Sequence, residues 1–444
     1  MTPAPTKTYD IVLPDNTERD RPRFSDYITV GKGEIKIVNT ANNLDDLAAY
    51  MGVSFRFNMM EFEPETCDLF DDKIHLSYEQ LRSELISCAS RFSLPKAAID
   101  DHLIALAQNN KHHPIKHWLD HGQWDGEKRI EQVISCFNPK HTELANSVLT
   151  RWLVGCVASL YEHRFKSKLV PVLQGDQSWK KTAAIERFAN VIPQAFLEGH
   201  ALNPDDKDSV LPCIRSWIVE LGELERTNKS SQGSLKAFIT KDTDTVRPPY
   251  ARNDIKKPRQ THFIGTVNGE DFLKDETGSS RFVVIEMTSI ADMDRLNSIL
   301  GWQYPGTGKI DLTHPELLHQ FWLEVKALYD SGHGWMLTQE EQEQAKSIND
   351  PYNDKGALYE YLRDHFAKET ENLTREELNW LTAGELVKND RKLSAHQSAL
   401  IGKALSKLAK ERLIPTRKGR ANRTEYYLHH ANRLNSDYDG FFSS

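Results

Sequence analysis

The sequence predicts an α/β fold in three parts, and three observations support it. Residues 1–50 are polar and irregular, but apolar residues recur every three or four positions from Ser77 to Asn109, which indicates a mainly helical N-terminal region over residues 1–145. Short apolar runs alternate with helical stretches over residues 146–345, which is typical of a layered core around a mainly parallel sheet. Residues 350–444 show helices followed by a basic hairpin, the order of a winged-helix domain.

Bulk composition excludes several classes of protein. The 444 residues are 39% hydrophobic and 27% charged, with no apolar run long enough for a membrane span and no apolar signal core at the N-terminus. Five scattered cysteines form no C-x-x-C pair, so a reducing cytoplasm is the simplest location. The net charge is -8, yet Lys and Arg dominate residues 388–423, and such a local basic surface is compatible with DNA binding.

The N-terminal region contains helical faces at Leu81–Ile86 and Ile99–Leu106, and weak strand signals at 28–30 and 34–38. Pro114 is expected to open a further helix. That helix would align three histidines spaced by four, His113, His117 and His121. Zinc can use such spacing, but no thiolate supports a metal site, and surface histidines are the favoured interpretation.

The central region contains four short apolar runs that we interpret as strands. They are Leu169–Leu173, Trp217–Leu221, Thr261–Gly265 and Arg281–Glu286. Helical stretches lie between them at 182–190 and 235–240, and Leu144–Leu160 precedes them as a buried helix. Strands and helices in alternation predict a parallel sheet.

A degenerate phosphate-binding loop lies between the first of these strands and the next helix. In the pattern G-x-x-x-x-G-K-[ST], Gly175 is the first glycine, Lys181 reaches the terminal phosphates, and Thr182 supplies the hydroxyl that binds Mg²⁺. Lys180 replaces the second glycine, and a residue with a Cβ atom is expected to avoid the left-handed conformation used there. A polar surface turn is the alternative interpretation.

The second strand ends in carboxylates, which an ATPase needs to orient Mg²⁺ and polarise the attacking water. Glu223 is the predicted catalytic carboxylate, and Glu220, on the opposite face of the strand, is the second candidate and a predicted metal ligand. Gly222 stands where an aspartate is usual. The alternative is an edge strand with solvated acids.

Two further polar residues follow in the expected order. Asn268 ends the third strand, where an amide can hold the lytic water near a γ-phosphate. Arg281 precedes the fourth strand and is placed to stabilise transferred charge in a neighbouring subunit's site. Each residue alone is ordinary, as a turn or a surface ion pair; their order after the loop makes them a constellation.

Several stretches together resemble the virulence-associated protein E family, phage- and island-borne proteins related to superfamily 3 helicases. The stretches are Trp124–Gly126, Val172–Gln177, Trp217–Leu224, Ser234–Phe238, Arg247–Arg252, Ile264–Asn268 and Thr277–Phe282. The resemblance implies an AAA+-like P-loop core that binds ATP and Mg²⁺. It also implies DNA unwinding or replication initiation by a homo-oligomeric ring, a hexamer, on single-stranded or forked DNA. Ser280 departs from the usual second arginine beside Arg281, and the N-terminal region is too short for a primase domain.

Basic residues gather between the second and third strands, where related helicases carry a hairpin that contacts the DNA backbone. Arg247, Arg252, Lys256 and Lys257 are the predicted DNA contacts, and a solvated charged loop is the alternative.

In the C-terminal domain a helix at 382–387 and a second at 397–412 precede strands at 413–417 and 425–428. Arg417, Lys418, Arg420 and Arg423 are the candidate wing contacts to DNA, and a scaffolding role is the alternative.

The sequence thus predicts an ATP-dependent DNA helicase or replication-initiation ATPase of a phage or mobile element. The alternative is a catalytically impaired DNA-binding or interaction protein that keeps the fold, because Lys180 and Gly222 stand where the ATPase pattern is strictest.

Overall fold

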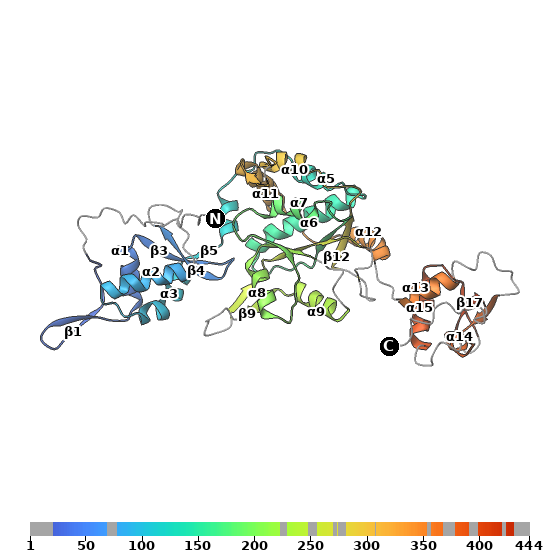
Figure 1. The fold of residues 1–444 in the computed structure, drawn as a ribbon, viewed down its shortest axis with the longest axis horizontal. Coiled ribbons are helices and arrows are strands. Elements are labelled where there is room, and N and C mark those ends of the chain that lie inside the picture. The colour runs from blue at the N-terminus through green and yellow to red at the C-terminus, as the bar shows by residue number, and fades with distance from the viewer. Residues whose placement is uncertain are drawn as a thin grey trace, which may run out of the picture. The chain divides into compact units, whose positions relative to one another are not determined.

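A computed structural model gives the fold (Figure 1). It describes residues 21–68, 78–222, 229–246, 255–269, 273, 281–306, 308–352, 357–366, 378–389, 398–419 and 423–429. The chain divides into two compact units, one comprising residues 1–272 with 279–351 and the other 273–278 with 352–444. No helix in the described ranges is both long and apolar enough to cross a bilayer.

A five-stranded sheet forms the centre of the first unit, in the order β12-β6-β11-β8-β7, and every neighbouring pair is parallel. Its strands are β6 (Val170–Gln174), β7 (Phe196–His200), β8 (Ile218–Leu221), β11 (His262–Val267) and β12 (Phe282–Glu286). The mixed α/β architecture with a parallel sheet is confirmed, and so are the four predicted strands. The edge strand β7 was not predicted, because its sequence Phe-Leu-Glu-Gly-His has only two apolar residues and is only partly buried.

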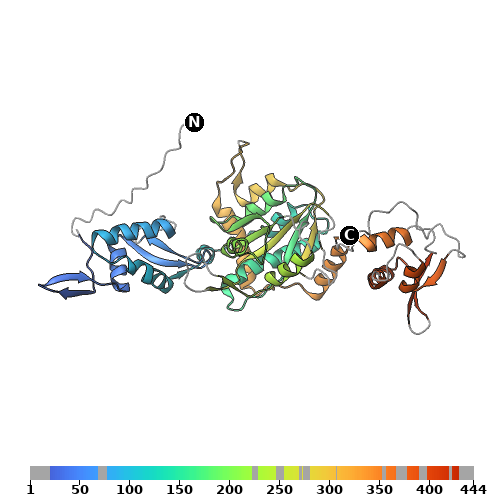
Figure 2. The same cartoon turned by 60° about the horizontal axis from the view of Figure 1, so that its bottom comes forward.

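Helices cover both faces of this sheet (Figure 1, Figure 2). One face packs on a large apolar cluster. The helices that contribute to this cluster include α5 (Ile130–Ser135), α6 (Thr142–Tyr161), α7 (Lys181–Ala189), α10 (Met293–Leu300), α11 (Pro315–Asp330) and α12 (Gln339–Asn349). Helix α9 (Lys229–Ile239) lies on the other face, where Phe238 meets Phe263 edge to face. Since α6 spans residues 142–161, the predicted domain boundary at residue 145 falls inside a core helix.

The strand order creates a switch point beside β6. From β6 the chain passes to β7 at the far edge, returns through β8 and β11, and then crosses to β12 on the other side of β6. In open parallel sheets, ligands bind outside the carboxyl ends of the strands at such a point. The segment after β6 therefore lies at the most favourable position for a binding loop.

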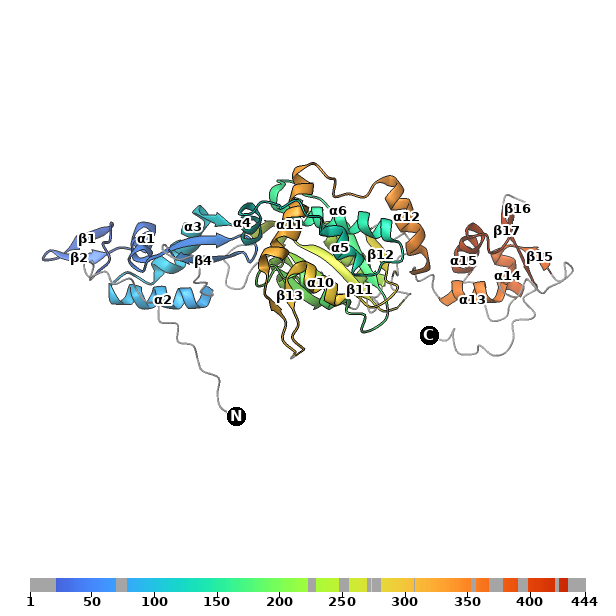
Figure 3. The same cartoon turned by 90° about the horizontal axis from the view of Figure 1, so that it is seen from above.

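Smaller elements complete the core. Helix α8 (Lys207–Arg215) precedes β8, and β9 (Thr243–Val246) pairs antiparallel with β10 (Ile255–Pro258). The short strands β13 (Trp302–Gln303) and β14 (Asp311–Leu312) form a hairpin that extends away from α10 and α11 (Figure 2, Figure 3).

The N-terminal region combines helices with a smaller number of strand residues. The predicted strands are confirmed as a hairpin, and a further sheet has the order β4-β3-β5. The elements are β1 (Tyr27–Val30), β2 (Glu34–Ile37), α1 (Ala41–Tyr50), β3 (Val53–Asn58), β4 (Glu63–Asp68), α2 (Tyr78–Arg91), α3 (Ala97–Asn109), β5 (Lys111–His112) and α4 (Pro114–Asp120). Alternating Phe55 and Phe57 enter the helical core, which is a period-two signal.

The second unit packs three helices against a three-stranded antiparallel sheet of order β15-β17-β16. Its elements are α13 (Ala357–Phe366), β15 (Leu378–Leu381), α14 (Ala383–Asn389), α15 (Ser398–Lys410), β16 (Thr416–Lys418) and β17 (Thr424–His429). A short 3-10 helix, η2 (Asp350–Tyr352), precedes them. The predicted helices and strands are confirmed; α13 and β15 were not predicted.

Candidate functional site

The loop from Gly175 to Lys180 joins β6 to α7 and contains two left-handed residues. Ser178 has φ 70°, and Lys180, the N-cap of α7, has φ 62° and ψ 25°. The expectation that Lys180 avoids this conformation is wrong. Left-handed residues flank Trp179, and such residues occur in the anion-binding concavities found at helix N-termini. The Trp179 amide itself donates to the Asp176 carbonyl (3.3 Å).

Gly175 is required by close packing. A Cβ atom there would lie 2.5 Å from Cε3 of Trp179, whose indole covers the glycine. The carbonyl of Trp179 accepts a hydrogen bond from the Ala291 amide (3.1 Å), which anchors this part of the loop to the segment after β12. The loop is therefore held in shape by its own tryptophan, a residue that the sequence pattern leaves unspecified.

Lys181 lies inside the loop. Its side chain is buried, with the residue 7% exposed, and its Nζ donates to the carbonyls of Gly175 (2.7 Å) and Asp176 (2.9 Å). Nζ also donates to Oδ1 of Asn268 (2.9 Å), at the carboxyl end of β11. The structure thus brings together Lys181 and Asn268, two residues predicted from separate parts of the sequence.

Glu220 is fully buried on β8 and accepts hydrogen bonds at both oxygens. Oε1 accepts from the hydroxyls of Thr182 (2.6 Å) and Thr266 (2.7 Å), and Oε2 accepts from the Gly199 amide (3.1 Å). A buried carboxylate needs such partners. Thr266 was missed by sequence analysis, although it lies two residues before Asn268 on the same face of β11.

Gly222 follows β8 where an aspartate is usual. A Cβ atom at Gly222 would lie 3.0 Å from the carbonyl oxygen of Gly199, in the irregular part of β7. A side chain at this position would displace that backbone. Glu223 lies outside the described residues, so Glu220 is the carboxylate that the described structure brings to Thr182.

Arg281 lies at the amino ends of the strands, opposite to the loop. Its carbonyl accepts from the Val170 amide (2.8 Å) at the start of β6, whereas the loop follows the end of that five-residue strand. At ~3.3 Å per residue the separation is roughly 16 Å, so Arg281 is not placed to contact the loop of its own chain. Its Nε is buried without a hydrogen-bond partner in the described structure.

The predicted basic loop is divided by the structure. Lys256 is exposed on β10, whereas Lys257 is 2% exposed. The Lys257 ammonium donates to the carbonyls of Met60 (2.6 Å) and Ile214, and burial lowers its pKa to about 7. The prediction of Lys257 as a DNA contact is therefore corrected, because a side chain enclosed in this way does not reach a phosphate. Arg247 and Arg252 lie outside the described residues.

In the second unit, the turn between β16 and β17 keeps two of the predicted basic residues exposed. Lys418 donates to the hydroxyl of Thr424 (3.1 Å), and Arg423 is exposed beside it. Arg417 pairs with Glu425 (2.7 Å) and stacks on Trp380 (4.3 Å to the ring centre). Arg420 lies outside the described residues.

The three histidines at spacing four do not converge. His113 caps α4, and burial lowers the pKa of its imidazole to about 3. The rings of His117 and His121 lie 3.9 Å apart, and Nδ1 of His121 bonds the His117 carbonyl (2.7 Å). No group of three metal-binding side chains occurs among the described residues.

Comparisons with known proteins place the chain in a family. No curated protein matches it. Among solved structures, the chain is similar to the apo C-terminal region of NrS-1 (residues 305–718). The similarity covers 87% of this chain and 98% of that one, with 12% identity and a TM-score of 0.46. A second form, the A form, gives 10% identity and the same TM-score. A family model, the virulence-associated protein E-like domain, matches residues 119–354, more than half of the sequence. The chain therefore belongs to the virulence-associated protein E-like family.

Proposed function

We propose that this protein is a DNA-dependent ATPase of a phage or mobile element, acting in DNA unwinding or replication initiation. The observation that carries the proposal is the set of contacts at the switch point. Lys181 and Thr182 begin α7, and they reach Asn268 on β11 and Glu220 on β8 (2.9 and 2.6 Å). A cation, a hydroxyl, a carboxylate and an amide thus meet beside the loop before α7, and phosphoryl transfer uses such a set of groups.

The residues fit ATP with Mg²⁺. The Thr182 hydroxyl is a suitable magnesium ligand, and Glu220, hydrogen-bonded to it (2.6 Å), would orient that ligand from behind. Lys181 would exchange its loop carbonyls for phosphate oxygens, and Asn268 would then be available to a water molecule. ATP supplies the phosphoryl group, and Mg²⁺ neutralises its charge.

A ring assembly explains the position of Arg281 in this proposal. Arg281 lies at the amino ends of the strands, whereas the loop of the same chain lies at their carboxyl ends. If Arg281 acts on phosphate, it must therefore act in a second copy of the chain. The proposed particle is a homo-oligomeric ring, a hexamer as in the related helicases. Mass measurement with and without nucleotide tests this part separately from hydrolysis.

DNA contact is proposed for two surfaces. Lys256, with Arg247 and Arg252 in the same basic loop, would contact the backbone of single-stranded or forked DNA. The second unit, with its order helix, strand, helix, helix and two strands, supports a winged-helix assignment. Lys418, Arg420 and Arg423 would contact phosphates there, with Arg417 held by Glu425.

The test is ATP hydrolysis with and without single-stranded DNA. Hydrolysis that rises with DNA and disappears in Lys181→Ala supports the proposal. Lys166→Ala, which removes an exposed lysine paired with Asp242 (3.5 Å), is the matched control and should retain turnover. Unchanged turnover in Lys181→Ala would mean that the site has been assigned to the wrong residues.

The rival is a DNA-binding protein without turnover, and Gly222 favours it. An aspartate cannot be accommodated there without moving Gly199, so the chain lacks one acid of the usual pair. No hydrolysis in either condition, with DNA binding intact, would support the rival.

A further inference from the structure

The two-stranded β9–β10 ladder lies outside the main sheet and needs support from elsewhere. An isolated pair of strands is marginal in water. In this ladder Lys257 faces Asp244, and Lys256 faces Thr245. Alternation directs Lys256 to solvent and Lys257 to the interior. The buried side of the ladder is therefore where its position is set.

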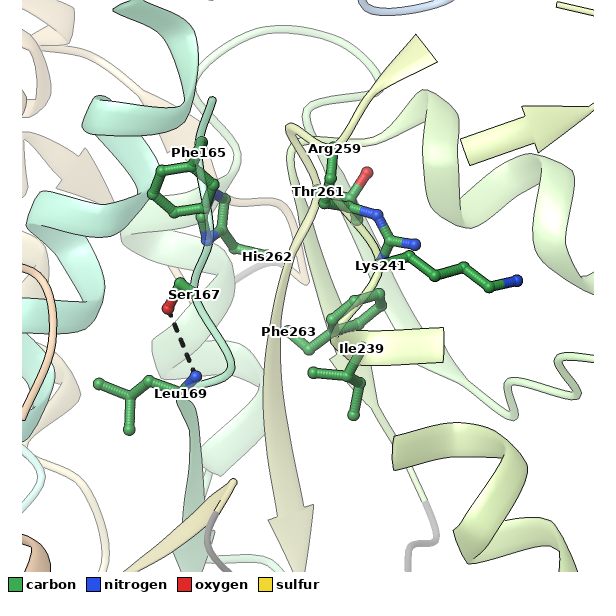
Figure 4. A pocket seen from close by; sticks show the side chains of 9 residues that line it. All are labelled: Phe165, Ser167, Leu169, Ile239, Lys241, Arg259, Thr261, His262 and Phe263. Carbon is green, nitrogen blue, oxygen red and sulfur yellow. Dashed lines mark hydrogen bonds between the residues drawn. The ribbon is translucent and has the colours of Figure 1, made fainter. Parts of the chain in front are cut away.

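One attachment joins the ladder to the central sheet. Arg259 binds Asp244 with two hydrogen bonds (Nε, 2.7 Å; Nη2, 2.5 Å), and both side chains are 4% exposed. The guanidinium lies 4.4 Å from the ring centre of Phe238 on α9 and 5.8 Å from that of Phe263 on β11. Figure 4 shows Arg259 beside Phe263, where a cavity of only about 10 Å³ remains. This end of the ladder is close-packed.

The second attachment is Lys257, and it joins the ladder to the N-terminal region. Its ammonium binds the carbonyl of Met60, in the turn between β3 and β4, and the carbonyl of Ile214, in the last turn of α8. Two carbonyl dipoles compensate a buried charge incompletely, so the contact is expected to add little to overall stability. The Lys257 ammonium is buried at a cost, yet it is well oriented toward both carbonyls. This favours a role in fixing the position of the ladder over a role in overall stability.

The β3–β4 turn, whose Met60 carbonyl binds Lys257, is held by hydrogen bonds of its own. Oδ1 of the buried Asn58 accepts from the amides of Met60 (2.9 Å) and Glu61 (3.1 Å). Beside it, Arg215 at the end of α8 pairs with Glu63 at the start of β4. The Met60 carbonyl is thus presented to Lys257 by a turn with its own hydrogen bonds.

We propose that Lys257 is a positioning residue that joins the β9–β10 ladder to the N-terminal β3–β4 turn, so that the N-terminal region fixes the placement of the exposed Lys256. The role in DNA contact rests on the proposed function, whereas the mechanical joint does not. Displacement of the N-terminal region would then alter DNA engagement without any contact between that region and ATP.

Hydrogen exchange of the full chain, without ATP or DNA, tests the joint. In Lys257→Met we expect exchange to rise at least tenfold both in residues 243–246 and 255–258 and in the turn at 59–62. The neighbouring exposed Lys256→Met is the matched control and should change neither segment. Leu85→Ala, a truncation in the N-terminal core, controls for a general loss of stability. A rise confined to the ladder, or one equalled by Leu85→Ala, overturns the proposal.

A second variant keeps the test decisive if Lys257→Met does not fold. Arg215→Met removes the partly exposed ion pair with Glu63 and should loosen the same two segments by a smaller factor. No coupled change in a folded Arg215→Met also overturns the joint.

DNA affinity tests the consequence. We expect the dissociation constant for single-stranded DNA to rise about fivefold in Lys257→Met, with DNA-free ATP hydrolysis unchanged. In Lys256→Met affinity should fall without altered exchange, because only the contact is lost. Coupled exchange with unchanged affinity would overturn the link to DNA. If the wild-type protein does not hydrolyse ATP, the proposed function fails, and hydrogen exchange still decides the joint.

Discussion

Replacing Lys180 with glycine tests whether the loop's departure from the phosphate-binding pattern is conformational. Lys180 is exposed, has φ 62° and ψ 25°, and begins α7. A left-handed conformation costs a residue with a Cβ atom roughly 1–2 kcal/mol. Glycine removes that cost but loses about 0.5–1 kcal/mol through the greater freedom of the unfolded chain. Lys180→Gly should therefore stabilise the first unit by about 0.5–1 kcal/mol.

The assay is thermal unfolding by calorimetry, with Lys180→Ala as the control. Alanine removes the charge and keeps the strain, so it separates the two effects. For a unit of this size the glycine variant should melt on the order of 1–2 °C higher than wild type, and the alanine variant should not. Ser178→Gly, at φ 70°, should give a gain of the same sign. If glycine and alanine melt at the same temperature, the backbone at Lys180 is not strained and the reasoning is refuted.

Four further outcomes can be checked. Glu220→Gln should cost about 2 kcal/mol by denaturant unfolding, because its NH2 group would face the Gly199 amide donor unless both threonine hydroxyls turned round to accept; a smaller loss than about 0.5 kcal/mol would contradict this. Gly222→Asp should destabilise by about 1–3 kcal/mol, since its Cβ lies 3.0 Å from the Gly199 oxygen, and unchanged unfolding would show that β7 moves freely. Arg259→Met should cost about 3–5 kcal/mol, as it removes the hydrogen-bonded ion-pair partner of the buried Asp244 carboxylate; restoration by a second change, Asp244→Asn, is the check. Burial lowers the pKa of Lys257 from 10.5 to about 7, so the unfolded chain binds more protons than the folded one between these pH values. The free energy of unfolding should therefore rise with pH across that window by at most about 1.4 kcal/mol per pH unit, and this rise should be absent from Lys257→Met.

The sequence predicted the parts of the site that depend on strand ends. Lys181, Thr182 and Asn268 each follow an apolar run, and in a parallel sheet the carboxyl ends of the strands share one edge. Their proximity therefore required only the order of the strands. The strand order itself, with β6 between β11 and β12, came from the structure.

Features that depend on register or on packing between distant segments were not predictable. The contact of Thr266 with Glu220 requires the pairing of Ile264 with Glu220, which places both on one face. The burial of Lys257 depends on the Met60 carbonyl, 197 positions away. A run of basic residues gives no sign of which member a distant turn will cover.

Several charged groups around the Lys257 ammonium also affect its pKa. Asp244 and Glu61 raise the pKa of its ammonium, whereas Arg259 and Arg215 lower it. Burial and the nearby acids Glu63 and Glu65 in turn raise the pKa of the Glu61 carboxyl. Removing Arg215, which lowers this pKa, should therefore narrow the pH window, whereas removing Asp244, which raises it, should widen the window.

The two departures from the ATPase pattern have different physical meanings. Lys180 adopts the conformation that glycine would have, so the amides of the loop keep their direction at a small energetic cost. At Gly222 a side chain would instead crowd the carbonyl of Gly199, and Glu220 is the carboxylate that accepts a hydrogen bond from the Thr182 hydroxyl. Under the proposed function we therefore expect phosphate binding to tolerate the first departure, and turnover to depend on the second. If the protein binds nucleotide but does not hydrolyse ATP, the defect lies at the end of β8. If it does not bind nucleotide, the defect lies in the loop, where Lys181 binds the carbonyls of Gly175 and Asp176.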